Sequence, residues 1–243
     1  MKNIDVFLLQ LFFIYICGKI IYMKTKAKPY LQKEESDEFK GVYVVKEPPV
    51  EYGLLSSPRY TYADYLSWMD EQRRELINGV VYLFSAPTRF HADITSEILS
   101  IFKWFVKKRK RKCKVYHAPF DVRLPKNGET ANEKINTVVQ PDICVICDQS
   151  KLDDAGCIGA PDLIVEVQSP STAKRDLREK FDLYEQSGVK EYWIVYPGDK
   201  GITVYTLQEN GKYNDGTTYV FSGKVPVGIF EGLEIDLKEL FDN

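Results

Sequence analysis

The stretch that decides the fold reads VVQPDICVIC at residues 138–147 and PDLIVEVQSPS at residues 161–171. Each half contains a short apolar run, rich in β-branched residues, of the kind that forms a buried strand. Each half also carries one conspicuous acid, Asp142 in the first and Glu166, between two valines, in the second. A carboxylate buried in a strand costs several kcal/mol unless it is paired, neutralised or bound to a metal. Two such acids on neighbouring strands suggest that they share one cation.

The segments around this stretch predict a mixed α/β domain. Apolar residues at helical spacing predict helices over residues 61–70, 90–108, 172–187 and 236–240. Runs rich in β-formers predict strands over residues 115–124, 138–147, 163–167 and 191–196, and an outer hairpin over residues 202–207 and 213–221. Asn78-Gly79 between two such runs predicts a further hairpin. This order favours one central mixed β-sheet flanked by helices.

The length of 243 residues fits one large domain with extensions, and a hydrophobic content of 44% is enough for a real core. We expect three parts. An apolar leader covers residues 1–28, and a polar, proline-punctuated arm covers residues 29–59. The globular domain then covers residues 60–243.

Within the leader, the apolar run 6–22 is broken by Lys19 and is at the short limit for a membrane span. A signal peptide is one interpretation, but no small-residue cleavage site follows the run. Weak membrane anchoring is a second interpretation, and translation that truly starts at Met23 is a third; we favour these two. The expected location is cytoplasmic, with anchoring to a membrane through residues 6–22 as the alternative.

A formal net charge of −2 gives the chain no general attraction for nucleic acid, but one basic run stands out. It consists of Lys107, Lys108, Arg109, Lys110, Arg111 and Lys112. Two interpretations stay open. The run is either the solvated end of a helix followed by a basic loop, or a contact with a phosphate backbone.

The five cysteines include a C-x-x-C at Cys144 and Cys147. Because the pair lies inside a predicted strand, the two side chains should point to opposite faces. No second C-x-x-C accompanies it, so we expect small buried apolar residues and no metal or redox role. An odd number of cysteines without a disulfide framework suits a reducing compartment.

The acids Asp142 and Glu166 suggest metal-dependent chemistry. Two carboxylates, a main-chain carbonyl and several waters would be enough to hold Mg²⁺, with Mn²⁺ as an alternative. Such a metal polarises a phosphoryl oxygen and activates a bound water. Lys180, on the margin of a helix's apolar stripe, can reach back over the sheet to stabilise developing charge. Glu75, at the head of a hairpin strand, could supply a third carboxylate.

The order of these residues resembles a known pattern. Pro141-Asp142, followed by Glu166-Val167-Gln168, is similar to the PD-(D/E)xK nuclease pattern. A longer series resembles the Uma-type restriction endonuclease family over about residues 60–240. The series comprises RELING at 74–79, Pro87 with His91, QPDI at 140–143, PDLIVEVQSPS at 161–171, Asp176, Lys180, Tyr184 and GVKEYWIV at 188–195.

The resemblance implies a restriction-endonuclease-like core, a divalent metal and hydrolysis of phosphodiester bonds in DNA. It assigns Asp142 and Glu166 as metal ligands and Glu75 as an accessory acid. The chain has Gln168 where the pattern places its lysine. Glutamine can orient a water but carries no charge, so Lys180 is the expected substitute. The predicted catalytic set is therefore Glu75, Asp142, Glu166, Gln168 and Lys180.

Alternatives remain open. Taken alone, Glu166 is also compatible with a structural acid paired with Lys180, and Asp142 with a turn residue after proline. His91 and His117 are expected to make structural contacts. For the whole chain, the alternative to a DNA endonuclease is a catalytically inactive module of the same fold that binds nucleic acid or a protein partner. A homodimer would suit an enzyme that cuts both strands of a duplex.

Overall fold

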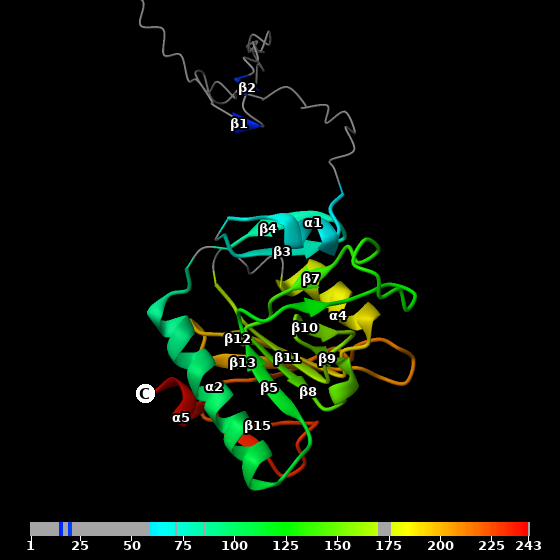
Figure 1. Cartoon of the computed structure of the whole chain (residues 1–243). Coiled ribbons are helices and arrows are strands. Elements are labelled where there is room, and N and C mark those ends of the chain that lie inside the picture. Colours follow the sequence, from blue (N-terminus) through cyan, green and yellow to red (C-terminus); the bar gives the residue numbers. More distant parts are fainter. Residues whose placement is uncertain are drawn as a thin grey trace, which may run out of the picture. The chain divides into compact units, whose positions relative to one another are not determined.

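The computed structural model describes residues 15–16, 19–20, 59–70, 72–84, 86–169 and 176–242 (Figure 1). The chain divides into two units, Met1–Leu55 and Ser56–Asn243. In the first unit, β1 (Tyr15–Ile16) pairs antiparallel with β2 (Lys19–Ile20). The expectations for the leader and the arm otherwise fall outside the described residues. No helix in the described ranges is long and apolar enough to cross a membrane.

One six-stranded sheet of the second unit has the order β4-β3-β7-β6-β10-β9. Its strands are β3 (Arg74–Ile77), β4 (Val80–Leu83), β6 (Val122–Arg123), β7 (Val138–Val139), β9 (Leu152–Asp153) and β10 (Gly156–Ile158). Asn78 and Gly79, with φ of 51° and 82°, make the two-residue turn between β3 and β4. The hairpin predicted at this dipeptide is confirmed, because both turn positions need positive φ.

The other six-stranded sheet has the order β14-β13-β12-β11-β8-β5. Its strands are β5 (Lys114–His117), β8 (Ile143–Ile146), β11 (Leu163–Val167), β12 (Glu191–Tyr196), β13 (Gly201–Thr206) and β14 (Thr217–Tyr219). β11 pairs parallel with β12 and antiparallel with β8, so this sheet is mixed. A separate two-stranded sheet joins β15 (Lys224–Pro226) to β16 (Glu234–Asp236).

The predicted mixed α/β fold, with a central mixed β-sheet flanked by helices, is confirmed, although the described strands form two six-stranded sheets instead of one. Residues 115–124 form two strands, β5 and β6, with a cis Ala118–Pro119 bond between them. Residues 138–147 likewise form β7 and β8, separated by Gln140, Pro141 and Asp142. Proline has no N–H to donate to a ladder, so each run breaks at its proline and continues in the other sheet. Asp142 therefore lies where the chain crosses from one sheet to the other.

Capping residues close to the helix ends explain where several helices begin and end. Thr61 caps α1 (Tyr62–Ser67) in a capping box with Asp64, and Thr88 caps α2 (Arg89–Lys108). The helix predicted at 172–187 is described from Asp176 onward, as the π-helix η2 (Asp176–Lys180) followed by α4 (Phe181–Ser187). Gly188, with a φ of 85°, ends it as predicted. The other helices of the described ranges are η1 (Gln149–Lys151) and α5 (Leu237–Phe241).

Strand β11 separates two apolar cores. Its odd-numbered residues pack with α2, where the Phe102 ring lies edge-on to Trp193 with centroids 5.9 Å apart. Ile164 packs on the opposite face with Leu183 and Tyr184 of α4. Because successive strand residues alternate between faces, Glu166 shares the α4 face with Ile164. Figure 1 shows α2 and α4 at different sides of this sheet.

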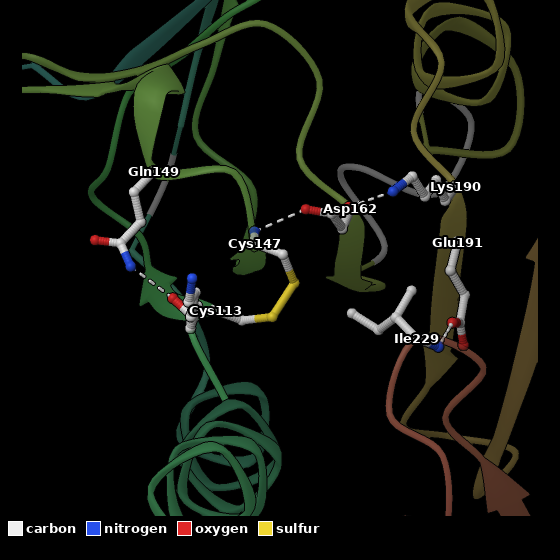
Figure 2. Close-up of a disulfide and its surroundings, with 8 residues drawn as sticks. Cys113, Cys147, Gln149, Asp162, Lys190, Glu191 and Ile229 are labelled. Carbon is white, nitrogen blue, oxygen red and sulfur yellow. Dashed lines mark hydrogen bonds and ion pairs between the residues drawn. A yellow bond between two sulfur atoms is a disulfide. The ribbon is translucent and has the colours of Figure 1, made fainter. Parts of the chain in front are cut away.

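The cysteines depart in part from the prediction. Cys144 and Cys157 are buried thiols, and burial raises the pKa of Cys157 to about 11. Cys147 instead forms a disulfide with Cys113 (Figure 2), so its expected role as a simple apolar residue is wrong. The cause is strand register, since Lys114 pairs with Ile146 in the antiparallel ladder. Cys113 precedes Lys114 and Cys147 follows Ile146, so the two cysteines lie opposite each other. Asp162 accepts a hydrogen bond from the Cys147 N–H at 2.7 Å.

Candidate active site

A cleft of about 670 Å³ lies at the break between β7 and β8. The first turns of α2, the end of β4, the end of β11 and the end of η2 also line it. The ionisable side chains that line the cleft come from a span of more than 100 residues, from Arg73 to Lys180. They are Arg73, His91, His117, Asp142, Glu166 and Lys180.

A buried ion group lies against the cleft, which two of its members, Glu166 and Lys180, line. Lys180 Nζ lies 2.9 Å from Glu75 Oε1 and 2.8 Å from Glu166 Oε1. Only 2% of the Lys180 side chain and none of the Glu75 side chain is exposed, so all three charges are shielded from water. A buried carboxylate without this ammonium would be strongly destabilising. The Gln140 N–H also donates to Glu75 Oε1 at 2.9 Å.

Tyr184 completes this group from one helical turn beyond Lys180. Its hydroxyl donates a 2.7 Å hydrogen bond to Glu166 Oε1. Burial, and then the nearby carboxylates of Glu166 and Glu75, raise the pKa of Tyr184 well above its ordinary value. The hydroxyl therefore stays protonated and acts as a donor. Spacing of four residues places Lys180 and Tyr184 on one helix face, which is why both reach the same carboxylate.

Asp142 is held from two sides. Its Oδ2 accepts a 2.8 Å hydrogen bond from the Val167 N–H, at the end of β11. The same oxygen lies 3.0 Å from His91 Nε2. His91 stands in the first turn of α2, where its N–H donates to the capping Thr88. The carboxylate is thus positioned by a strand and a helix, in the cleft that Glu166 also lines.

The donor set fits a hard divalent cation. Asp142 and Glu166 offer carboxylate oxygens, which are the ligands that Mg²⁺ and Mn²⁺ prefer. Across the described residues, no three His, Cys, Asp or Glu side chains are grouped closely enough to hold a metal by themselves. A cation between two carboxylates would keep several waters, which is how proteins usually bind Mg²⁺.

The structure brings together most of the residues predicted from sequence. Glu75, Glu166 and Lys180 are in direct contact, and Asp142 lies in the same cleft. Gln168 is not among the residues that line the cleft; its N–H donates to the Val195 carbonyl at 2.9 Å.

The basic run 107–112 lies elsewhere. It begins at the C-terminal end of α2, about 25 Å along the helix from His91 at 1.5 Å per residue. Lys108 and Arg109 line a different groove of about 1030 Å³, beside β15 and β16. The predicted phosphate contact there is therefore remote from the acids.

Sequence reasoning missed two residues of the cleft. His91 was expected to be structural, yet it contacts Asp142. His91 and Asp142 are 51 positions apart in the chain, so no local sequence pattern predicts their contact. Arg73, which lines the cleft, was passed over, although it stands two residues before Glu75 and a strand places such residues on one face.

Comparison with known proteins gives a family match, a relative and a structural neighbour. Residues 62–238 match the model of the Uma2 family, described as putative restriction endonuclease. An uncharacterized protein of Synechocystis, slr1290, is 25% identical over 161 residues, covering 64% of this chain and 78% of that protein. The crystal structure of a putative nuclease of the DUF820 group from Anabaena variabilis shares the fold, with a TM-score of 0.60 and 22% identity. That alignment covers 75% of this chain and 98% of the other.

Proposed function

Since the chain belongs to the Uma2 family of putative restriction endonucleases, we propose that it hydrolyses phosphodiester bonds in DNA with the help of Mg²⁺ or Mn²⁺. A nuclease is supported by both the family and the fold. The finer proposal names the site: Asp142 and Glu166 hold the cation in the cleft between the two sheets.

One observation carries the proposal. Lys180 Nζ contacts Glu166 Oε1 at 2.8 Å, which supports the proposal that this lysine replaces the one that the nuclease pattern carries two residues after its acid. The ammonium stabilises negative charge that develops on the phosphate oxygens and holds the attacking water by a hydrogen bond. A metal held by Asp142 and Glu166 would supply Lewis acidity and would help to activate water for the attack.

The other residues prepare the site. Glu75 shares the Lys180 ammonium and fixes its position through a 2.9 Å contact. Tyr184 donates to Glu166, and the Val167 N–H donates to Asp142, so both proposed ligands are oriented before a cation binds. Gln168 receives no role because it does not line the cleft.

Cleavage assays test the proposal. The full chain is incubated with supercoiled plasmid, linear duplex and single-stranded DNA in Mg²⁺, Mn²⁺ or chelator. Cleavage should require metal, and Asp142→Asn and Glu166→Gln should each slow it by more than about a hundredfold, because a lost metal contact costs several kcal/mol. Asp215→Asn, which removes an exposed acid outside the cleft, should cut at the wild-type rate.

The outcomes also separate the alternative function. Metal-dependent cleavage that survives both cleft variants would place the chemistry elsewhere. DNA binding without cleavage, together with no effect of Mg²⁺ or Mn²⁺ on thermal stability, would identify an inactive module of the nuclease fold. In that case the contacts of Lys180 with Glu75 and Glu166 serve stability alone.

A further inference from the structure

Arg73 and Arg74 stand side by side in the sequence but have different surroundings. Arg74 is buried, pairs with Asp70 and lies over the Trp68 ring, with its Cζ 4.7 Å from the ring centroid. Arg73 precedes it and therefore points to the opposite face, the one that carries Glu75. This face borders the cleft, and Arg73 lines it. Within the described ranges, no carboxylate is paired with Arg73.

The Arg73 side chain is held in place by Gln140. Its Nε and Nη2 donate to Gln140 Oε1 at 3.4 and 3.3 Å. The amide cannot turn over, because Gln140 Nε2 donates to Asp121 Oδ1 at 2.9 Å and a carboxylate can only accept. The Gln140 Oε1 must therefore face Arg73. In this orientation, the Gln140 amide oxygen holds the edge of the Arg73 guanidinium that carries Nε and Nη2.

Two more contacts hold Arg73 and Gln140 in place, one through Asp121 and one through Phe84. Tyr65 OH donates to Asp121 Oδ1 at 3.2 Å, and burial and the Asp121 carboxylate raise the pKa of Tyr65, so its hydroxyl stays a donor. The Arg73 Cζ lies 5.7 Å from the centroid of the Phe84 ring, which covers one face of the guanidinium. An arginine fork carries five N–H donors, and among the described residues the Arg73 side chain donates hydrogen bonds only to Gln140.

A preorganised guanidinium with spare donors is the geometry that binds a phosphate through two parallel hydrogen bonds. Arg73 lies directly before β3 and two residues before Glu75, where its carbonyl accepts a hydrogen bond from the Phe84 N–H at 3.1 Å. It lines the same cleft as Asp142 and Glu166, and hence lies next to the proposed chemistry. We propose that Arg73 binds a backbone phosphate of DNA beside the bond that is cut, with Gln140 as its positioning residue. The choice of ligand rests on the proposed function.

Salt-dependent DNA binding tests this assignment. A fluorescein-labelled duplex is titrated with the full chain in chelator, by anisotropy, over a series of salt concentrations. Each phosphate contact contributes about 0.9 to the slope of log affinity against log salt, so Arg73→Gln should lower that slope by about 0.9 and weaken binding at every salt concentration. Lys212→Gln removes the same charge from an exposed residue outside the cleft, paired with Glu185, and should leave the slope unchanged.

A second variant, Arg73→Lys, separates the loss of the Arg73 charge from misfolding of the chain. Arg73→Lys keeps the charge but loses the fork, so it should keep the wild-type slope and bind less tightly. The proposal is overturned if Arg73→Gln matches Lys212→Gln, if Arg73→Lys loses the slope as Arg73→Gln does, or if the wild-type chain binds no duplex. Because binding is measured without metal, an inactive protein that binds through Arg73 would refute hydrolysis and leave this assignment standing.

Discussion

Lys180 Nζ lies 2.8 Å from Glu166 Oε1, although the two residues are 14 positions apart and belong to a helix and a strand. Two residues after the acid, directly beyond the end of β11, the chain has Gln168, which carries no charge. The helix thus supplies the ammonium that the strand lacks. Because Lys180 also contacts Glu75, we expect it to contribute to stability as well as to the proposed chemistry.

Replacement of Lys180 by methionine should destabilise the fold. It leaves Glu75 and Glu166 as buried carboxylates without a cation, which costs about 3–5 kcal/mol in comparable cases. Urea unfolding measures the loss. Tyr184→Phe, which removes one hydrogen bond to Glu166, should cost less, about 1–3 kcal/mol. If Lys180→Met is as stable as the wild type, the three groups do not form an ion cluster in solution.

Replacement of His91 by alanine should weaken metal binding. The imidazole orients Asp142 through a 3.0 Å contact, and loss of such a supporting residue lowers metal affinity by about 10- to 100-fold. Calorimetric titration with Mn²⁺ measures the change. His117→Ala is the matched control, because His117 lines the same cleft but contacts the Ala118 carbonyl. Equal affinities for the two variants would show that His91 does not position the ligand.

Reduction of the Cys113–Cys147 disulfide should lower stability. The bond spans 34 positions, and constraining a loop of that size stabilises a fold by about 3–4 kcal/mol in the chain-entropy model. Thermal unfolding with and without a reductant measures the effect. Cys113→Ser should unfold at one temperature in both conditions. A wild-type chain that is insensitive to reductant would show that the two thiols are not bonded in solution.

Removal of the Asp153 charge should give a pH-dependent loss of stability. The hydrogen bond from the buried Arg123 guanidinium lowers the pKa of Asp153 below its ordinary value of 3.8. A lowered carboxyl pKa stabilises the fold above pH 3.8 and loses that contribution as the pH falls through the folded-state pKa. Asp153→Asn should therefore be less stable than wild type at neutral pH, with a gap that closes below about pH 4. A constant gap in urea unfolding across this range would contradict the ion pair.

Local chemistry explains what the sequence predicts well. Asn78-Gly79 specifies its turn because both positions tolerate positive φ, and Gly188 ends its helix for the same reason. Glu166 between two valines signals a buried acid, and helical spacing brings Lys180 to the sheet side.

Long-range pairing explains what the sequence does not predict. The apolar runs show that strands exist, but not that each run changes sheet at Pro119 or Pro141. The disulfide follows from the register of β5 with β8, and the His91–Asp142 contact from the docking of α2 at the crossing point. Neither the disulfide nor the His91–Asp142 contact can be read from neighbouring residues in the sequence.

Calorimetric titration of Mn²⁺ into the full chain tests most directly whether Asp142 and Glu166 share one cation. The wild-type protein should bind one ion per chain, and Asp142→Asn and Glu166→Gln should each abolish the heat signal while the protein stays folded by circular dichroism. Binding that persists unchanged in both variants, or a wild-type chain that binds no Mn²⁺, would contradict a metal site in this cleft.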